Sequence, residues 1–173
     1  IKGWHLAIDT QSTKVGISDN EKLKIFRWED GWYLWGSDIE SNSGGTQIFS
    51  ADESLSYFAV LNKEDNQDVI RVYEEDFDAS DWSLYPSAGG SDPASPVTIS
   101  EGNTTSIALC DKDLYAISNG SLVSFYKYKA GDGGAYILKA NISPENPDYN
   151  TSFGYSMACQ IDDTDGFRLA IGT

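Results

Sequence analysis

An alanine flanked by apolar residues recurs four times in this sequence, in Leu6-Ala7-Ile8, Phe58-Ala59-Val60, Tyr115-Ala116-Ile117 and Leu169-Ala170-Ile171. The runs lie roughly 50 to 57 residues apart, which is the spacing of β-propeller blades. A small central side chain suits a strand near the axis of such a fold, where neighbouring blades converge and large side chains would clash. The repeat therefore predicts blades.

The stretches between the alanine runs supply three more strands per unit. In the second unit they are Val69-Ile70-Arg71-Val72-Tyr73, the aromatic stretch Trp82-Ser83-Leu84-Tyr85 and Ser106-Ile107-Ala108-Leu109. Turn-forming segments such as Glu29-Asp30-Gly31 and Gly131-Asp132-Gly133-Gly134 separate the second and third strands. No window shows a helical period with start and stop signals. The sequence predicts an all-β chain whose blades each have four antiparallel strands.

The repeat divides the 173 residues into units 4–55, 56–112 and 113–166, with the start of a further unit at 167–173. A four-stranded sheet with two apolar faces cannot bury both of them alone, so it must stack on copies of itself. Closed propellers typically need about four blades or more. We therefore expect these three units to belong to a larger propeller.

The last unit resembles a known family. Phe153-Gly154-Tyr155-Ser156-Met157-Ala158, followed by 162–173, is similar to the FG-GAP repeat of integrin-alpha-type β-propellers. Ile70-Arg71-Val72-Tyr73 resembles a strand of the related propeller repeats of microbial surface proteins. Gly45-Thr46-Gln47-Ile48 and Thr105-Ser106-Ile107-Ala108 stand where Phe-Gly would be, so the first two units resemble diverged members.

The family often binds calcium in a loop with oxygen ligands at positions one, three, five and nine and a glycine at six. Placing Gly166 at position six puts Asp163 and Asp165 at three and five, but Ile161 at one and Leu169 at nine. Calcium takes six to eight oxygen ligands, so two carboxylates would bind it weakly. A solvated acidic turn is the favoured interpretation, a weak calcium site the alternative, and no other cofactor is expected.

Charge and sequons point to an extracellular protein. The formal net charge is -15, so nucleic acids and anionic lipids would be repelled. No apolar run approaches the roughly 20 residues of a membrane-spanning helix. Four N-glycosylation sequons begin at Asn103, Asn119, Asn141 and Asn150, which indicates a secreted or cell-surface glycoprotein. Pro144, directly after the sequon of Asn141, makes that site the weakest.

The two cysteines, Cys110 and Cys159, fall at the end of the same stretch in successive units. Two separate buried thiols are the favoured interpretation. The alternative is a disulfide, because equivalent positions of neighbouring blades can bring the Cα atoms within about 7 Å.

The sequence lacks a recognisable catalytic constellation. His5 is the single histidine, so any triad or zinc cluster would depend on it. We expect no enzyme but an extracellular propeller acting as a protein-interaction, adhesion or structural module of a cell-surface or appendage assembly. Its expected partners are other subunits or further blades, with a glycan as a further possible ligand of the many aromatic residues. The alternative is an accessory or catalytic propeller domain of a secreted carbohydrate-active hydrolase or lyase.

Overall fold

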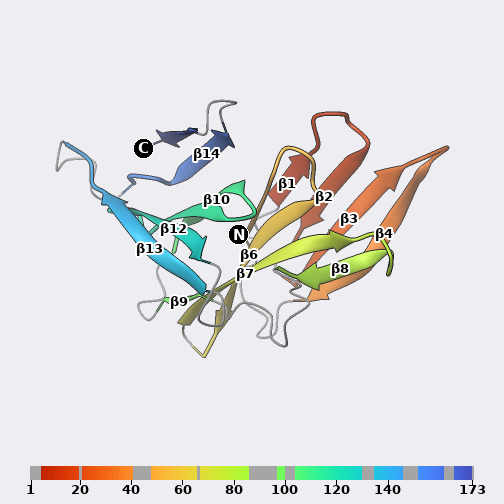
Figure 1. The fold of residues 1–173 in the computed structure, drawn as a ribbon, viewed down its shortest axis with the longest axis horizontal. Coiled ribbons are helices and arrows are strands. Elements are labelled where there is room, and N and C mark those ends of the chain that lie inside the picture. Colours follow the sequence, from red (N-terminus) through yellow and green to blue (C-terminus); the bar gives the residue numbers. More distant parts are fainter. Residues whose placement is uncertain are drawn as a thin grey trace.

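The computed structural model describes residues 5–19, 21–40, 48–65, 67–85, 97–99, 104–129, 135–145, 152–161 and 166–172. Every helix or strand within these ranges is a β-strand, which confirms the all-β prediction. The strands form four antiparallel sheets that follow one another along the chain (Figure 1).

Each sheet is built from strands that are consecutive in sequence. Sheet 1 contains β1 (His5–Ile8), β2 (Lys14–Ser18), β3 (Lys22–Trp28) and β4 (Trp32–Glu40). Sheet 2 contains β5 (Ile48–Ala51), β6 (Tyr57–Glu64), β7 (Gln67–Asp76) and β8 (Asp81–Leu84), and β9 (Val97–Ile99) also pairs with β7. Sheet 3 contains β10 (Ser106–Asp111), β11 (Leu114–Ser118), β12 (Val123–Lys129) and β13 (Ala135–Ile142). Sheet 4 contains the described strands β14 (Ser156–Ile161) and β15 (Phe167–Gly172).

The sheets pack face to face in sequence order, with a core between each pair. We call the side of a sheet that faces the preceding sheet its front and the side that faces the following sheet its back. Sheets 1 and 2 share Leu23, Ile25, Ile39, Phe49, Leu55, Phe58 and Val60. Sheets 2 and 3 share Ala59, Leu61, Ile70, Val72, Ile107, Leu109, Tyr115 and Ile117. Ala116, Val123 and Phe125 of sheet 3 pack against Met157, Leu169 and Ile171 of sheet 4.

Strand register shows which residues are equivalent between the sheets. On each second strand, a small residue at the centre pairs with a small residue of the first strand: Gly16 with Ala7, Ala59 with Ser50, Ala116 with Ala108, and Ala170 with Ala158. Gly16, Ala59, Ala116 and Ala170 are therefore the equivalent positions.

The strand register corrects the predicted alignment of the first alanine run with the other three runs. Ala7 lies on the first strand of its sheet, whereas Ala59, Ala116 and Ala170 lie on second strands. Gly16 occupies the position that the repeat assigned to Ala7. Sheets 2 and 3 also begin one strand before the predicted units 56–112 and 113–166, at β5 and β10.

The turn between the first and second strands is also repeated. The Oδ1 atom of Asp9 accepts hydrogen bonds from the backbone N–H groups of Thr13 and Lys14 at 2.7 and 2.9 Å. The Oδ1 atom of Asp52 accepts from Ser56 and Tyr57, four and five residues further on, at 2.9 Å each. Because an aspartate side chain can replace backbone partners in this way, two unrelated turn sequences adopt one geometry.

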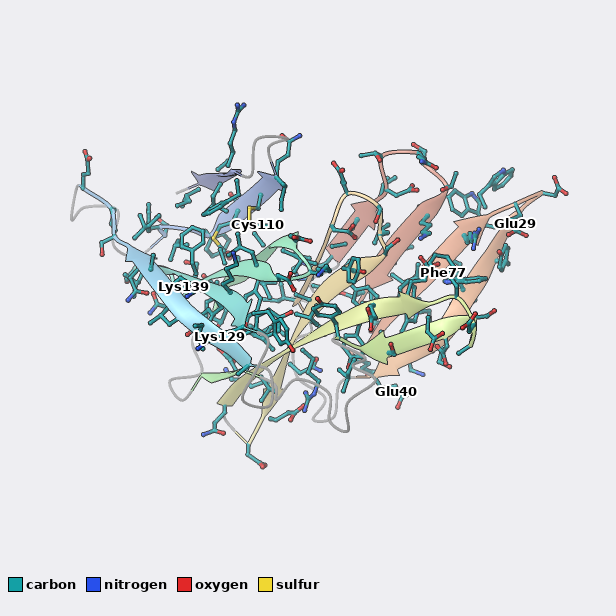
Figure 2. The ribbon with its side chains drawn as sticks, viewed as in Figure 1. Glu29, Glu40, Phe77, Cys110, Lys129 and Lys139 are labelled. Carbon is teal, nitrogen blue, oxygen red and sulfur yellow. A yellow bond between two sulfur atoms is a disulfide. The ribbon has the colours of Figure 1, made fainter. Side chains whose placement is uncertain are left out.

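A disulfide joins sheets 3 and 4. Cys110 at the end of β10 is bonded to Cys159 of β14, with the Cα atoms 4.8 Å apart (Figure 2). The favoured prediction of two separate thiols is therefore wrong. Stacking brings the two strands together, because Cys110 lies on the side of β10 that packs against β14.

Candidate functional site

The front of sheet 1 is an apolar face that crosses all four of its strands and is exposed on the outer strands β1 and β4. Register places Ile8, Val15, Phe26 and Leu34 in one row. Leu6 and Ile8 are 65% and 56% exposed, and Leu34 is also exposed. Contiguous apolar surface of this kind marks an interaction site in soluble proteins.

Equivalent positions in the next two sheets are buried. Leu6 corresponds to Phe49 of sheet 2 and Ile107 of sheet 3, which are 6% and 5% exposed. In both sheets, the preceding sheet covers this residue. The front of sheet 1 thus carries the kind of residue that is buried between sheets elsewhere, but no described sheet packs against it.

An aromatic position is likewise packed between sheets in sheets 2 and 3 but exposed in sheet 1. Trp32 of sheet 1 corresponds to Trp82 of sheet 2 and Tyr136 of sheet 3. Trp82 packs on Phe58 with ring centroids 4.8 Å apart and donates its Nε1–H to the backbone oxygen of Trp35 in sheet 1. Trp32 instead remains 51% exposed, beside the exposed Trp28 at 5.5 Å between ring centroids.

The back of sheet 4 presents small and polar side chains. Ala158 and Ala170 face each other across β14 and β15, and both are exposed. Gln160 and Arg168 form the next pair on this face and are also exposed. Because Ala59 and Ala116 at the equivalent position are fully buried against the following sheet, this face also has the composition of a junction surface.

The junction between sheets 1 and 2 shows which polar contacts such a surface makes. The Nζ atom of Lys14 lies 2.6 Å from Oε2 of Glu75, and Ser56 donates to the same oxygen at 3.2 Å. Nearby, the backbone N–H of Ser37 donates to Asp81 at 2.7 Å, which lowers the pKa of that carboxyl below its ordinary value. These contacts bind the sheets through side chains from both.

The pKa values of Tyr85 and Lys112, at the junction of sheets 2 and 3, are both raised, which keeps the two side chains in their ordinary protonation states. Burial raises the pKa of Tyr85 to about 12, and its hydroxyl donates to Asp113 at 2.7 Å. The Nζ atom of Lys112 donates to the Tyr85 oxygen at 2.7 Å, and this contact raises the pKa of Lys112. Acid–base catalysis favours a pKa near the working pH. The contacts among Tyr85, Lys112 and Asp113 are therefore better suited to holding sheets 2 and 3 together.

A groove of about 880 Å³ lies between sheet 3 and the two strands of sheet 4. Phe125, Ala140 and Ile142 line its apolar floor, and Lys127 and Lys139 lie at its sides. Its lining residues from sheet 3 lie mainly on β12 and β13, and Leu169 and Ile171 of β15 line it from sheet 4. The groove is thus a continuation of the stacking surface between these sheets.

Two of the predicted glycosylation sites lie in the described residues. Asn119 is exposed in the turn after β11, where its Oδ1 atom accepts from the N–H groups of Ser121 and Leu122 at 3.0 and 2.9 Å. Asn141 is exposed near the end of β13, and Ser124 donates to its Oδ1 atom at 2.8 Å. Both side chains are accessible from solvent.

The other predicted site residues, Asn103, Asn150, Asp163 and Asp165, lie outside the described residues. Within the described part, no cluster of three or more His, Cys, Asp or Glu side chains could hold a metal ion. His5 lies on β1, where burial lowers its pKa. The described ranges include no helix long and apolar enough to cross a membrane.

Sequence reasoning missed the exposed front of sheet 1 as a surface. The signal was present in β1, where Leu6 and Ile8 alternate with His5 and Ala7, but alternation alone does not tell which face is covered. The sequence matches no protein-family model, and a search of curated proteins finds no match. The resemblance to FG-GAP repeats therefore stays a prediction.

Proposed function

We propose that this chain is a segment of an extracellular β-propeller that acts as a non-catalytic interaction module of a cell-surface or appendage assembly. The observation that carries the proposal is the repeated junction, in which the back of each sheet packs on the front of the next through the same set of positions. Consecutive antiparallel four-stranded sheets that stack through their faces are the units from which propellers are built.

The exposed front of sheet 1 supports an interaction role. Single exposed apolar residues are ordinary, but an apolar row across four strands is not. This row is exposed at Ile8 and Leu34 and half-buried at Val15 and Phe26 between them, which favours a contact surface. The residues at the equivalent positions of sheets 2 and 3 are buried by another sheet. A partner that presents a β-sheet face would therefore fit sheet 1.

Two features support an extracellular location. The disulfide between Cys110 and Cys159 is a bond that persists in oxidising compartments. The sequon residues Asn119 and Asn141 are exposed, as glycosylation requires.

The second candidate is a propeller domain of a secreted carbohydrate-active enzyme. Trp28 and Trp32 favour it, because exposed indole rings next to the acidic tip Glu29-Asp30 could stack on sugars. Trp82 and Tyr136, the equivalents of Trp32 in sheets 2 and 3, pack against a preceding sheet. The interaction role therefore explains the exposed Trp32 equally, and it accounts for Leu6 and Ile8 as well.

Cross-linking mass spectrometry on cells that produce the protein separates the two candidates. Lys24 lies on the front of sheet 1, paired with Ile17, so links from Lys24 to another protein chain are expected. In parallel, hydrolysis is measured on a panel of polysaccharides and binding is measured on a glycan array, each with and without calcium. Hydrolysis that disappears in Trp32→Ala would overturn the proposal in favour of the enzyme.

A further inference from the structure

A pocket of about 480 Å³ lies beside the disulfide between sheets 3 and 4, and both Cys110 and Cys159 line it. Asp52 and Glu53 line it from sheet 2, and Asp111 lines it from sheet 3. Cys110 is 7% exposed and Cys159 is half-buried, so Cys159 is the more accessible end of the bond. A pocket of this size admits a small molecule to the disulfide.

The pocket lies at the ends of strands, away from the outward faces of sheets 1 and 4. Asp52 and Glu53 directly follow β5 in the turn to β6. Asp111 ends β10 and Ile161 ends β14, again where the first strand of a sheet enters the turn to the second. Further sheets of a propeller stack on faces, so they would leave this end of the strands accessible.

We infer that the bond between Cys110 and Cys159 is a thiol-exchange site, which small thiols with a positively charged group cleave and negatively charged thiols leave intact. The inference does not depend on the proposed interaction role. It rests on the carboxylates of Asp52, Glu53 and Asp111 beside the bond, and no Lys or Arg among the described residues lines the pocket.

The charge of the pocket determines which thiol reaches the sulfur. The attacking species is a thiolate, and the three carboxylates repel its negative charge. An ammonium group on the same small molecule offsets this repulsion, whereas a carboxylate or sulfonate group adds to it. The pocket therefore discriminates between reagents that carry the same reactive group.

The exchange begins when a thiolate attacks Sγ of Cys159. A new S–S bond forms between the reagent and Cys159, and the electron pair of the broken bond leaves with Sγ of Cys110, which takes a proton from water. A second thiolate then attacks the reagent's sulfur in this mixed disulfide. It releases the disulfide of two reagent molecules and the Cys159 thiolate, which is protonated in turn, so two thiols are oxidised and one bond is reduced.

Cleavage is expected to loosen sheet 4. Among the described residues, the buried core at this junction consists of Ala116, Val123 and Phe125, all from sheet 3, and the residues that sheet 4 contributes are only partly buried. Sheets 2 and 3 instead share eight buried residues from both sheets. Thiol exchange therefore acts at the junction whose remaining packing is weakest.

Reduction rates of the 173-residue chain by cysteamine and by mercaptoethanesulfonate test the inference. The two thiols differ in an ammonium against a sulfonate group. Each rate is followed by alkylation of the freed cysteines at low ionic strength and divided by the thiolate concentration. The ratio of the cysteamine rate to the sulfonate rate should fall about two- to fivefold in Glu53→Gln and in Asp111→Asn. It should also fall in about 1 M salt, where charges are screened beyond about 3 Å.

Asp78→Asn is the matched control. It removes the same charge from the exposed hairpin tip beside Phe77, well apart from the disulfide, and should leave the ratio unchanged (Figure 2). Peptide mapping after brief exposure to cysteamine and alkylation should place the mixed disulfide on Cys159 and the alkyl group on Cys110. Thermal melts of the oxidised variants establish that each is folded.

Three results would overturn the inference. The first is a bond that neither thiol reduces until urea unfolds the chain, which would show that the pocket gives no access. The second is a rate ratio that stays the same in Glu53→Gln, in Asp111→Asn and in high salt. The third is a mixed disulfide on Cys110, which would show that the thiol enters from another side.

Discussion

The Nζ atom of Lys14 lies 2.6 Å from Oε2 of Glu75, in an ion pair that crosses from sheet 1 to sheet 2. Only 11% of the Lys14 side chain and 1% of the Glu75 side chain are exposed. An ion pair withdrawn from water in this way contributes little relative to an apolar pair, but removal of one partner leaves a buried charge without compensation. We therefore expect the pair to favour one register between these sheets over others.

Lys14→Met is expected to lower the free energy of unfolding by about 3–5 kcal/mol, because Glu75 would remain buried and unpaired. Urea denaturation measures the change. Lys22→Met is the control, since Lys22 is 40% exposed and its pairs with Asp38 and Glu40 are worth at most about 1 kcal/mol. The double variant Lys14→Met, Glu75→Leu should recover much of the loss. If Lys14→Met and Lys22→Met were equally stable, the buried ion pair between sheets 1 and 2 would be contradicted.

The bond between Cys110 and Cys159 closes a loop with a sequence separation of 49. A loop of this size predicts a loss of about 4 kcal/mol on reduction. Hydrogen exchange followed by mass spectrometry should show faster exchange in β14 and β15 after reductant is added, with little change in sheet 1. The variant lacking both cysteines should not respond to reductant. Unchanged protection of β14 after reduction would contradict the docking role of the bond.

Gly36 lies in β4 with a φ of 70°, and a Cβ atom there would lie 2.7 Å from Nε1 of Trp82. Gly36→Ala should lower the melting temperature, because it adds a left-handed backbone cost of about 1–2 kcal/mol to a clash with the next sheet. A Cβ on Gly31 would meet nothing within 4 Å, so Gly31→Ala is the control. A harmless Gly36→Ala would show that Trp82 does not approach this backbone.

The native protein is expected to carry glycans on Asn103, Asn119 and Asn150. The exposed turn position of Asn119 makes it accessible to the transferase, whereas Pro144 disfavours use of Asn141. Peptide mapping with and without enzymatic deglycosylation measures occupancy at each site. If none of the three sites carried a glycan in protein from its natural source, secretion through a glycosylating pathway would be contradicted.

The sequence was sufficient to predict most of the strands and a repeat, because strand alternation and the alanine runs are local signals, but it missed β2 and so the phase of the first unit. It could not assign Gly16, since a glycine between Val15 and Ile17 does not stand out as part of an alanine repeat, while Ala7 offered a better match one strand away. The cysteine pairing depended on the 4.8 Å between two Cα atoms, a distance that only stacking determines. Lys14 and Glu75 lie 61 residues apart in sequence, so nothing local connects them.

The small residue at each junction is the most direct consequence of stacking. Ala116 is fully buried on the back of sheet 3, against Met157, Leu169 and Ile171 of sheet 4. A leucine there would have to displace side chains of the next sheet, which costs about 1–3 kcal/mol in a well-packed core. Ala135 at the start of β13 is exposed and lies outside the groove between sheets 3 and 4, so the same substitution at that position provides the control.

The measurement that tests the central claim is therefore the urea unfolding of Ala116→Leu beside Ala135→Leu, in dilute solution. Face-to-face stacking of successive sheets predicts that Ala116→Leu loses about 1–3 kcal/mol and that Ala135→Leu changes the free energy of unfolding by less than about 0.5 kcal/mol. An Ala116→Leu variant as stable as the unaltered chain would contradict the stacking of sheet 4 on sheet 3 and, with it, the repeated junction.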